Sequence, residues 1–356
     1  MERLYFQMDI APIASPLLAW YGKCARILPW REDPTPYHVW VSEIMLQQTR
    51  VEAVKAYYSR FIKELPNVGA LAEADEDKLL KLWEGLGYYS RVRNMQKAAK
   101  IIQNEYGGEI PSEFEVLLKL PGIGRYTAGA ISSIAFGKPE SAVDGNVLRV
   151  LARICGSFAD VSLPQMKKEA ELILRDIIPE GRASSFTQAL MELGAIVCLP
   201  NGTPLCKQCP LAAFCEARKR EIVDQLPVKK PPLKRKKEQK TVFVLICNGR
   251  LALSKREKKG LLAGMWELPN AEGKLSEQEV QSYLFSGGVE ADNLEPLSDA
   301  KHIFSHVEWD MAGYYVSVIQ QGFAQFEWVS LEELEQDYAI ASAFSAYLKI
   351  AKEKLL

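Results

Sequence analysis

The chain has 356 residues, of which 48% are hydrophobic and 25% charged, a composition typical of globular proteins, and its length suggests two domains. No apolar run reaches the roughly eighteen residues of a membrane span, and the N-terminus lacks a secretory-signal pattern, so we expect a cytoplasmic protein without a membrane partner. A net charge of −1 disfavours nucleic-acid binding unless the basic residues are clustered.

The N-terminal part of the chain, from about residue 12 to residue 222, has the patterning of an almost entirely helical domain. Before it, residues 2–7 read ERLYFQ, one letter from a common tag-cleavage site, so residues 1–8 receive no functional weight. Thr35 and Pro36 predict the N-cap and first position of a helix. Further helices are predicted over residues 125–136, from about 144, and over 165–178 and 184–197.

A glycine-rich turn separates two of these helices. Ser112 and Glu115 predict a capping box for the first, and residues 120–124 (LPGIG) then form a turn that glycine enters most easily. Its amides and the next helix N-terminus would face outward, which is an arrangement that binds phosphate. From the turn alone, two interpretations stay open: Gly122 and Gly124 lie against a DNA backbone, or the turn is an ordinary corner between helices.

Two carboxylates in the helical part are candidates for acid–base chemistry. Glu43 has apolar neighbours in residues 41–46 (VSEIML), and burial there would raise its pKa and make it a proton donor. Asp144 directly precedes a predicted helix and suits the N-cap of that helix. Taken singly, an exposed glutamate and a capping aspartate are the more ordinary interpretations of these two residues.

Four of the seven cysteines lie close together in the sequence, at Cys198, Cys206, Cys209 and Cys215. In a reducing compartment such a group more often binds a metal than forms disulfides. Four thiolates can hold either zinc or a [4Fe–4S] cluster. Zinc ribbons usually use two Cys-x-x-Cys pairs, and the single pair here favours iron–sulfur without excluding zinc.

The composition of the sequence changes after the cysteines. Residues 227–240 contain three prolines and seven basic residues against one acid, which indicates a linker, either a solvated tether or a strap along DNA phosphates. Beyond it, strands are predicted at 241–246 and 251–254, joined by an Asn248-Gly249 turn. Further strands are predicted at residues 314–319 and 326–329. The C-terminal part is therefore expected to mix helices and strands.

Several of these motifs together resemble one family. The LPGIG turn with the following RYTA, the VDGNVLR motif around Asp144 and the cysteine loop are similar to the helix–hairpin–helix DNA glycosylases of the endonuclease III superfamily. Residues 39–50 (VWVSEIMLQQTR) and 83–91 (WEGLGYYSR) resemble its adenine-specific branch. The resemblance extends over roughly residues 15–350. One departure is the seven-residue gap after Cys198, where the family more often has six.

The resemblance implies a monofunctional glycosylase. Lyase members carry a Schiff-base lysine directly after the position of Arg125, and this chain has Tyr126 there. By the same resemblance, Glu43 protonates adenine N7, and Asp144 stabilises the oxocarbenium-like sugar, as the two carboxylates of a retaining glycosidase do. Tyr126 and Asn146 would position these groups.

The resemblance also assigns binding residues and a cofactor. The adenine must leave the base stack, and Arg31 would line its pocket. Gln48 and Tyr88 would fill or wedge the opened duplex, although taken singly they look like helix surface and core packing. Gly122 and Gly124 would contact the DNA backbone, and the four cysteines would hold a [4Fe–4S] cluster.

The C-terminal part resembles the MutT-like, Nudix-fold domain of the same family, most clearly at residues 260–269 (GLLAGMWELP). Residues 270–288 lack the Arg-Glu-x-x-Glu-Glu helix of working Nudix hydrolases, so we expect no hydrolysis there. By resemblance, Phe304, Ser305 and His306 belong to the loop that recognises 8-oxoguanine opposite the adenine. The alternative is a core phenylalanine and an ordinary hairpin serine.

The sequence thus predicts an all-α helix–hairpin–helix glycosylase domain over residues 9–226 with its iron–sulfur loop at 198–215, a basic linker over 227–240, and an α+β Nudix-like domain over 241–356. We expect a monomer that removes adenine opposite 8-oxoguanine or guanine from double-stranded DNA. The alternatives are an endonuclease III-type glycosylase/lyase, a non-catalytic damage sensor and a nucleotide hydrolase. Tyr126 disfavours the glycosylase/lyase. The presence of both carboxylates disfavours the damage sensor, and the missing acidic helix disfavours the nucleotide hydrolase.

Overall fold

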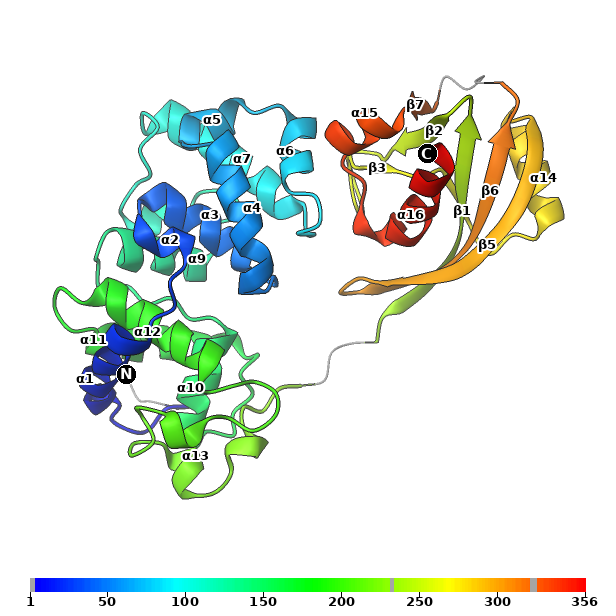
Figure 1. Cartoon of the computed structure of the whole chain (residues 1–356). Helices are drawn as coiled ribbons and strands as arrows, with labels where there is room; N and C mark the ends of the chain where they lie inside the picture. Colours follow the sequence, from blue (N-terminus) through cyan, green and yellow to red (C-terminus); the bar gives the residue numbers. More distant parts are fainter. Residues whose placement is uncertain (1–3, 231–233, 321–324) are drawn as a thin grey trace. The chain divides into compact units, whose positions relative to one another are not determined.

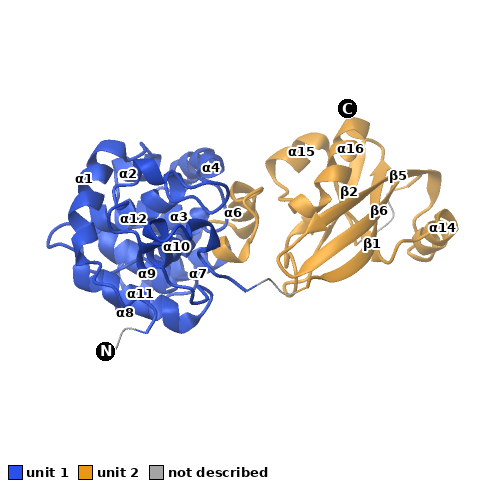
Figure 2. Ribbon diagram, turned by 90° about the horizontal axis from the view of Figure 1, so that it is seen from below, with its two compact units in different colours: residues 1–73, 93–231 blue, residues 74–92, 232–356 orange. Residues whose placement is uncertain are grey.

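A computed structural model describes residues 4–230, 234–320 and 325–356 (Figure 1). The chain divides into two compact units, coloured separately in Figure 2. The helical unit contains residues 1–73 and 93–231, and the C-terminal unit contains residues 74–92 and 232–356. No helix within the described residues is long and apolar enough to cross a membrane.

The helical unit confirms the predicted all-α fold, and short helices alternate with tight turns throughout it. Its helices are α1 (Ala14–Cys24), α2 (Pro29–Glu32), α3 (Pro36–Leu46), α4 (Val51–Glu64), α5 (Val68–Glu73), most of α7 (Ser90–Glu105), α8 (Phe114–Leu117), α9 (Arg125–Ala130), α10 (Gly145–Cys155), α11 (Pro164–Ile177), α12 (Ala183–Ile196) and α13 (Glu216–Lys219). A π-helical turn, η2 (Ile131–Ala135), extends α9. The predicted helix over residues 125–136 is therefore confirmed, with an expanded last turn.

Two helix starts show where local sequence chemistry predicts a cap correctly and where it does not. The Thr35 side chain accepts a hydrogen bond from the His38 amide at 3.2 Å, and Pro36 is the first residue of α3, as predicted. The predicted capping box at Ser112 is wrong. Helix α8 begins at Phe114 without a side-chain cap, because the Ser112 hydroxyl points to the Glu113 carboxylate at 3.4 Å instead of to the helix amides.

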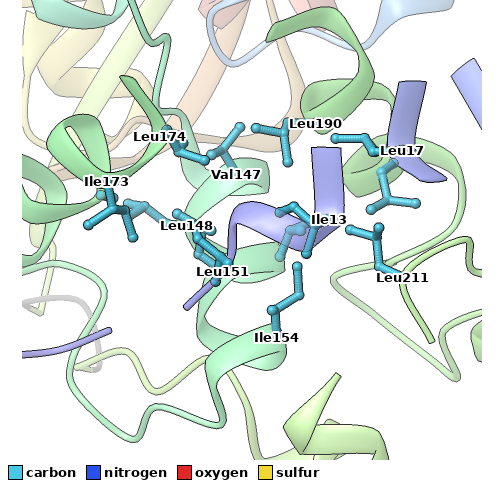
Figure 3. Close-up of a cluster of buried hydrophobic side chains, with 14 of the residues drawn as sticks. Ile13, Leu17, Val147, Leu148, Leu151, Ile154, Ile173, Leu174, Leu190 and Leu211 are labelled. Carbon is cyan, nitrogen blue, oxygen red and sulfur yellow. The ribbon is translucent and has the colours of Figure 1, made fainter. Parts of the chain in front are cut away.

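The core of the helical unit is built around α10. Its apolar residues recur at helical spacing and meet side chains from α1, α11 and α12 (Figure 3). Figure 3 labels Ile13, Leu17, Val147, Leu148, Leu151, Ile154, Ile173, Leu174, Leu190 and Leu211. Since Asp144 is the N-cap of α10, the same packing that buries the helix also fixes the position of that carboxylate.

The N-terminal segment is part of this core. Phe6 is fully buried, and the buried Glu169 carboxylate of α11 accepts hydrogen bonds from the amides of Leu4, Tyr5 and Phe6 at 2.9–3.2 Å. Three amides around one carboxylate form a set of charge-assisted hydrogen bonds. The described residues from Leu4 onward thus have a structural role that their likeness to a tag site did not suggest, while residues 1–3 lie outside the described part of the chain.

The C-terminal unit confirms the mixed α and β prediction. Its described residues form a seven-stranded sheet in the order β3-β2-β1-β6-β5, with β4 paired to β1 and β7 to β2. The strands are β1 (Lys236–Cys247), β2 (Arg250–Lys255), β3 (Trp266–Glu267), β4 (Asn270–Glu272), β5 (Ala291–Ile303), β6 (Val307–Val318) and β7 (Glu327–Val329). The helices are α6 (Glu76–Leu82), α14 (Glu277–Ser286), α15 (Leu331–Gln336) and α16 (Ser345–Leu355). A second apolar core, formed by β1, β6 and α14, stabilises this unit.

The sequence pattern predicted the turn between β1 and β2 but not the position at which β1 begins. Asn248 and Gly249 both have positive φ and connect β1 to β2, as predicted for this turn. Strand β1 starts at Lys236, inside the segment 227–240 that we predicted as a linker, because residues 236–246 pair in parallel with β6. Residues 231–233 of that segment lie outside the described residues, and the predicted domain boundaries stay a prediction.

Candidate active site

The helical unit contains a cavity of about 730 Å³ among α2, α3, α9, α10 and α12. Its size is within the range of small-molecule sites. The residues lining it include seven of those singled out from the sequence, namely Arg31, Glu43, Gln48, Gly124, Tyr126, Asp144 and Asn146. All of them belong to the helical unit, so the cavity does not depend on the C-terminal unit.

Glu43 is buried in this cavity. It belongs to α3, where its neighbours are apolar, and it is 5% exposed, which excludes the exposed-glutamate interpretation. Burial raises the pKa of Glu43 to about 7, against a hydrogen bond from Tyr126 that lowers it, and the charge of Asp144 adds to the rise. A carboxyl group with this pKa is partly protonated at neutral pH and can donate a proton.

Tyr126 holds the Glu43 side chain. Its hydroxyl donates a hydrogen bond to Glu43 Oε2 and lies 3.3 Å from Met191 Sδ. Burial, and next the charge of Glu43, raise the pKa of Tyr126 well above its ordinary value, so the hydroxyl stays protonated as a donor. Tyr126 lies in α9, which the π-helical turn η2 extends, and such turns occur frequently at functional sites.

Asp144 caps α10 and also faces the cavity. Its Oδ1 accepts a hydrogen bond from the Val147 amide at 2.8 Å, and its Oδ2 accepts one from Asn146 Nδ2 at 2.7 Å. Burial raises the pKa of Asp144, while these two hydrogen bonds lower it. The capping and catalytic interpretations of Asp144 are therefore compatible, because one carboxylate occupies both positions.

The Asn146 side chain is itself held in place by a neighbouring arginine. Its Oδ1 accepts a hydrogen bond from Arg149 Nη2 at 2.9 Å, and Arg149 also donates to the carbonyls of Gly194 and Cys198 at 2.8 and 2.9 Å. A Cβ atom on Gly194 would lie 2.6 Å from Asn146 Cβ, so only glycine allows this approach. The sequence reasoning missed Arg149 and Gly194, although a buried arginine within an apolar helix was a usable signal.

Arg31 forms a charged wall of the cavity. Its Nη2 lies 2.8 Å from Glu192 Oε2, and Arg26 Nε lies 2.7 Å from Glu192 Oε1. Burial opposes ionisation of Glu192, but the hydrogen bonds from Arg26 and Arg31 outweigh it and hold the pKa at about 2. Glu192 therefore stays ionised and keeps Arg31 in place. Sequence reasoning missed Arg26 and Glu192, which are separated by more than 160 residues.

Gln48 and Tyr88 share an unusual backbone conformation. Their φ angles are 61° and 48°, in the left-handed region that costs a non-glycine residue about 1–2 kcal/mol. Gln48 is exposed and lines the cavity of the helical unit. Tyr88 is 49% exposed and belongs to the compact unit that also contains the C-terminal sheet. The exposure of Tyr88 does not agree with core packing, whereas the exposure of Gln48 agrees with an ordinary surface position as well as with a DNA contact.

The glycine turn has the predicted form. Gly122 has a φ of 78°, and a Cβ atom there would lie 2.7 Å from Asn94 Cβ, so this position requires glycine. Gly124 is the residue before α9, and nothing lies within 4 Å of the position where its Cβ would be. The open space beside Gly124 leaves the N-terminus of the helix accessible to a phosphate.

Phe304, Ser305 and His306 form the turn between β5 and β6. The Phe304 amide donates to the Val307 carbonyl at 2.8 Å, and its ring makes an edge contact with Trp309 at 4.9 Å between centroids. Ser305 and His306 are exposed, with Ser305 Oγ 3.2 Å from His306 Nδ1. The phenylalanine is thus anchored, and the two polar side chains point to solvent.

The four cysteines line one small cavity together with Arg153 and Arg218. Arg153 Nη1 lies 3.2 Å from Cys198 Sγ. Burial raises the pKa of Cys209 to about 12, and the charges of the other three cysteines add to the rise, so the thiols need a cation or cluster to ionise together. Within the described residues, no three His, Cys, Asp or Glu side chains converge on a single-ion site. Four thiols beside two arginines fit an anionic iron–sulfur cluster.

This fold and this cavity are those of a helix–hairpin–helix base-excision protein joined to a Nudix domain. Residues 41–180 match the model of the HhH-GPD superfamily of base excision DNA repair proteins, and residues 241–349 match the model of the NUDIX domain. The first match includes both cavity carboxylates, and the second covers most of the C-terminal sheet.

Comparison with known proteins narrows the class. The chain is 36% identical to the human adenine DNA glycosylase over 84% of its own length and 66% of the human protein, just under two thirds of that relative. It is 34% identical to the adenine DNA glycosylase of Buchnera aphidicola subsp. Baizongia pistaciae, with 82% of each chain covered. The chain belongs to the adenine DNA glycosylase family.

Solved structures agree with this placement for the helical part. A thermostable thymine-DNA glycosylase has a TM-score of 0.54 and 28% identity, covering 59% of this chain and 96% of that chain. An endonuclease III trapped in a covalent complex with DNA has a TM-score of 0.51 and 27% identity, covering 60% of this chain and 97% of that chain. The helical unit therefore has the endonuclease III fold.

Proposed function

We propose that this chain hydrolyses the N-glycosidic bond of adenine paired with 8-oxoguanine or guanine in double-stranded DNA. The observation that carries the proposal is the meeting, in one cavity, of Glu43 with a pKa of about 7 and the half-buried carboxylate Asp144. Two carboxyl groups whose environments differ are suited to act as acid and as electrostatic stabiliser. Membership of the adenine DNA glycosylase family indicates the base that is removed.

In this proposal, Glu43 is the general acid. A pKa near the working pH gives both a useful protonated fraction and a favourable proton transfer. Tyr126 occupies Oε2 of the carboxyl group, which leaves Oε1 to carry the proton towards adenine N7. Arg31, fixed by Glu192, lines the pocket that receives the flipped base.

Asp144 is the group that stabilises the sugar as the bond to adenine breaks. Its two oxygens are oriented by the Val147 amide and by Asn146, so the charge is fixed in place before the reaction. It acts electrostatically or as a transient covalent partner, and water is the final nucleophile. Asn146, held by Arg149, is a positioning residue for this carboxylate.

The proposal includes excision without strand cleavage. Tyr126 has no amine, so it cannot form the Schiff base that a lyase requires. The cavity lining does include one lysine, Lys167 of α11, and this side chain is the candidate to examine if cleavage occurs. Borohydride trapping of the wild type should give no covalent adduct with DNA. An adduct that disappears in Lys167→Gln would show lyase chemistry from this residue.

DNA contacts are assigned to residues with accessible backbone or side chains. Gly122 and Gly124 would place turn amides and the N-terminus of α9 against a phosphate. Gln48 and Tyr88 would enter the duplex where the adenine has left, and their left-handed backbone presents each side chain outward.

The C-terminal unit would read the opposite base. Phe304 would stack beside 8-oxoguanine, and Ser305 and His306 would offer polar contacts from the same exposed turn. Residues 270–288 carry no Nudix acidic motif, and α14 is instead a capped helix with Val280 and Leu284 buried, which supports recognition rather than hydrolysis.

Cys198, Cys206, Cys209 and Cys215 would hold a [4Fe–4S] cluster. When bound, the cluster supplies four covalent links that fix the loop between residues 198 and 215. Arg153 would hydrogen-bond the sulfur of Cys198 and offset the negative charge of the cluster.

We propose that the protein acts on DNA as a monomer.

A single-turnover assay tests the proposal. The substrate is a duplex with adenine opposite 8-oxoguanine, and the products are examined with and without alkali. Strand breakage only after alkali is the expected result, because monofunctional excision leaves an abasic site. Breakage without alkali would place the protein with the lyases, and no excision under either condition would leave a DNA-binding sensor.

A further inference from the structure

The segment Ala74–Val92 interrupts the helical unit in sequence but belongs to the C-terminal unit in space (Figure 2). It contains α6 and the turn that carries the exposed Tyr88. The exposed turn Phe304–His306 belongs to the same compact unit. Two candidate DNA-reading elements, separated by more than 200 residues, are thus parts of one structural body.

Lys81 joins α6 to the C-terminal helices. Its ammonium donates hydrogen bonds to the carbonyls of Leu334 and Tyr338 at 3.2 and 2.9 Å. Both carbonyls lie at or just beyond the C-terminal end of α15, where the helix dipole favours a cation. The Lys81 side chain is 20% exposed, so these bonds are largely shielded from water.

Glu84 completes the connection. Its Oε2 pairs with the Lys81 ammonium at 2.8 Å, and its Oε1 accepts a hydrogen bond from the Ile340 amide at 2.8 Å. Asp77, near the start of α6, pairs with Lys255 at the end of β2 at 2.9 Å. Both ends of α6 are therefore tied to the unit that carries the sheet.

The turn after α6 links this connection to Tyr88. Trp83 Nε1 donates to the Gly87 carbonyl at 3.1 Å, and Arg91 Nη2 donates to the carbonyls of Leu86 and Gly87 at 3.0 and 3.1 Å. The Arg91 guanidinium lies over the Trp83 and Tyr88 rings, 5.2 and 5.7 Å from their centroids. The strained backbone at Tyr88 is thus held by Trp83 and Arg91, which belong to the same segment as Lys81.

We propose that Lys81 and Glu84 are positioning residues for opposite-base selection, because they fix the turn that carries Tyr88 to the unit that carries Phe304–His306. The inference rests on the DNA-reading roles proposed above for Tyr88 and for that turn. When 8-oxoguanine is seated at Phe304–His306, the connection brings Tyr88 into its place in the duplex, and the two events are energetically coupled. Opposite guanine, which the turn holds less firmly, the coupling contributes little.

The test is Lys81→Met in the full-length protein, which keeps the length of the side chain and removes its three donors. We expect single-turnover excision opposite 8-oxoguanine to fall about tenfold, within the usual range of coupling between sites. Excision opposite guanine should change by less than about twofold. Lys81→Arg keeps the charge and the donors and should restore most of the preference.

Lys352→Met is the matched control. Lys352 lines the same surface cavity as Lys81 but pairs with Glu335 at 2.8 Å and not with residues 74–92. The control should keep the wild-type preference between the two opposite bases. Hydrogen exchange gives a second readout that needs no activity: residues 83–90 should exchange faster in Lys81→Met and should not do so in Lys352→Met.

Distinct outcomes would overturn the inference. An equal loss on both substrates in Lys81→Met would show a merely structural residue, and an unchanged preference would show that the connection does not affect selection. If the wild type excised no adenine from either duplex, the proposed function would fail and the selection role with it. The hydrogen-exchange result would then still show whether Lys81 holds the turn.

Discussion

Polar side chains are shielded from water in the catalytic cavity but exposed to it on the turn Phe304–His306. In the cavity, Glu43 is buried, Tyr126 and Asp144 are half-buried, and all three are hydrogen-bonded to one another or to fixed neighbours; the loss of water around them shifts the pKa of each. On the turn, Ser305 and His306 are exposed and bonded to each other. Proton transfer requires a group whose pKa the protein has moved, whereas recognition of a base requires a group that is free to leave water for DNA.

The cavity and the turn also differ in the free-energy cost of placing their polar groups. Burying a carboxyl group is costly, and the helical unit offsets that cost with hydrogen bonds from Tyr126, Val147 and Asn146. A substitution in the cavity therefore disturbs both chemistry and local structure. A substitution on an exposed turn leaves the folded state almost unchanged and acts through the bound DNA. Variants that separate these effects test the comparison.

The largest effect is expected for Asp144→Asn. Asparagine caps a helix as well as aspartate does, so α10 and the fold should persist. The loss of the negative charge beside the sugar should lower single-turnover excision by about a thousandfold or more. Binding to lesion-containing DNA, measured by fluorescence anisotropy, should stay within about threefold of the wild type. A joint loss of binding and excision would instead assign Asp144 a mainly structural role.

The next effect concerns pH. Glu43 must be protonated to act as the acid, and its pKa is about 7, so excision should decline as the pH rises through that value. The Tyr126 hydrogen bond lowers the pKa of Glu43, so Tyr126→Phe should move the midpoint of this decline to higher pH. The measurement is the single-turnover rate as a function of pH for both proteins.

Tyr37→Phe is the matched control for this shift. Tyr37 is also buried, but its hydroxyl donates to the Leu65 carbonyl at 2.8 Å and lies outside the cavity lining. Its removal should leave the midpoint in place. A midpoint that moved to lower pH in Tyr126→Phe, or that moved equally in both variants, would contradict the assignment of Glu43 as the titrating acid.

Local patterns predicted the elements that depend on local chemistry. The cap at Thr35, the turn at Asn248 and the helix after Asp144 follow from short-range preferences and are present in the structure. Strand β5 (Ala291–Ile303) was not predicted, because its mostly exposed residues lack the alternation of a half-buried strand. The burial of Phe6 was also missed, because it depends on Glu169 far along the chain.

The candidate site shows the same division. Glu43 and Asp144 were recognised through the resemblance of their motifs to a known family, and the structure brings both into one cavity. Glu192 and Arg149 were not recognised, because their roles depend on hydrogen-bond partners that only the folded chain brings close to them. The placement of residues 74–92 with the C-terminal unit was equally invisible, because helical periodicity does not show which body a helix packs against.

The smallest effect is expected for Ser305→Ala, and it addresses the recognition side of the comparison. Ser305 is exposed, so its hydroxyl contributes little to the folded state, and the melting temperature should not change. Loss of one hydrogen bond to 8-oxoguanine should reduce the preference for that base over guanine by about fivefold, near the net value of a single such bond. Ser282→Ala, on the exposed side of α14, serves as a control. If Ser305→Ala slowed excision equally opposite both bases, the turn would contribute to the chemical step, and the separation between a buried catalytic region and an exposed reading region would not hold.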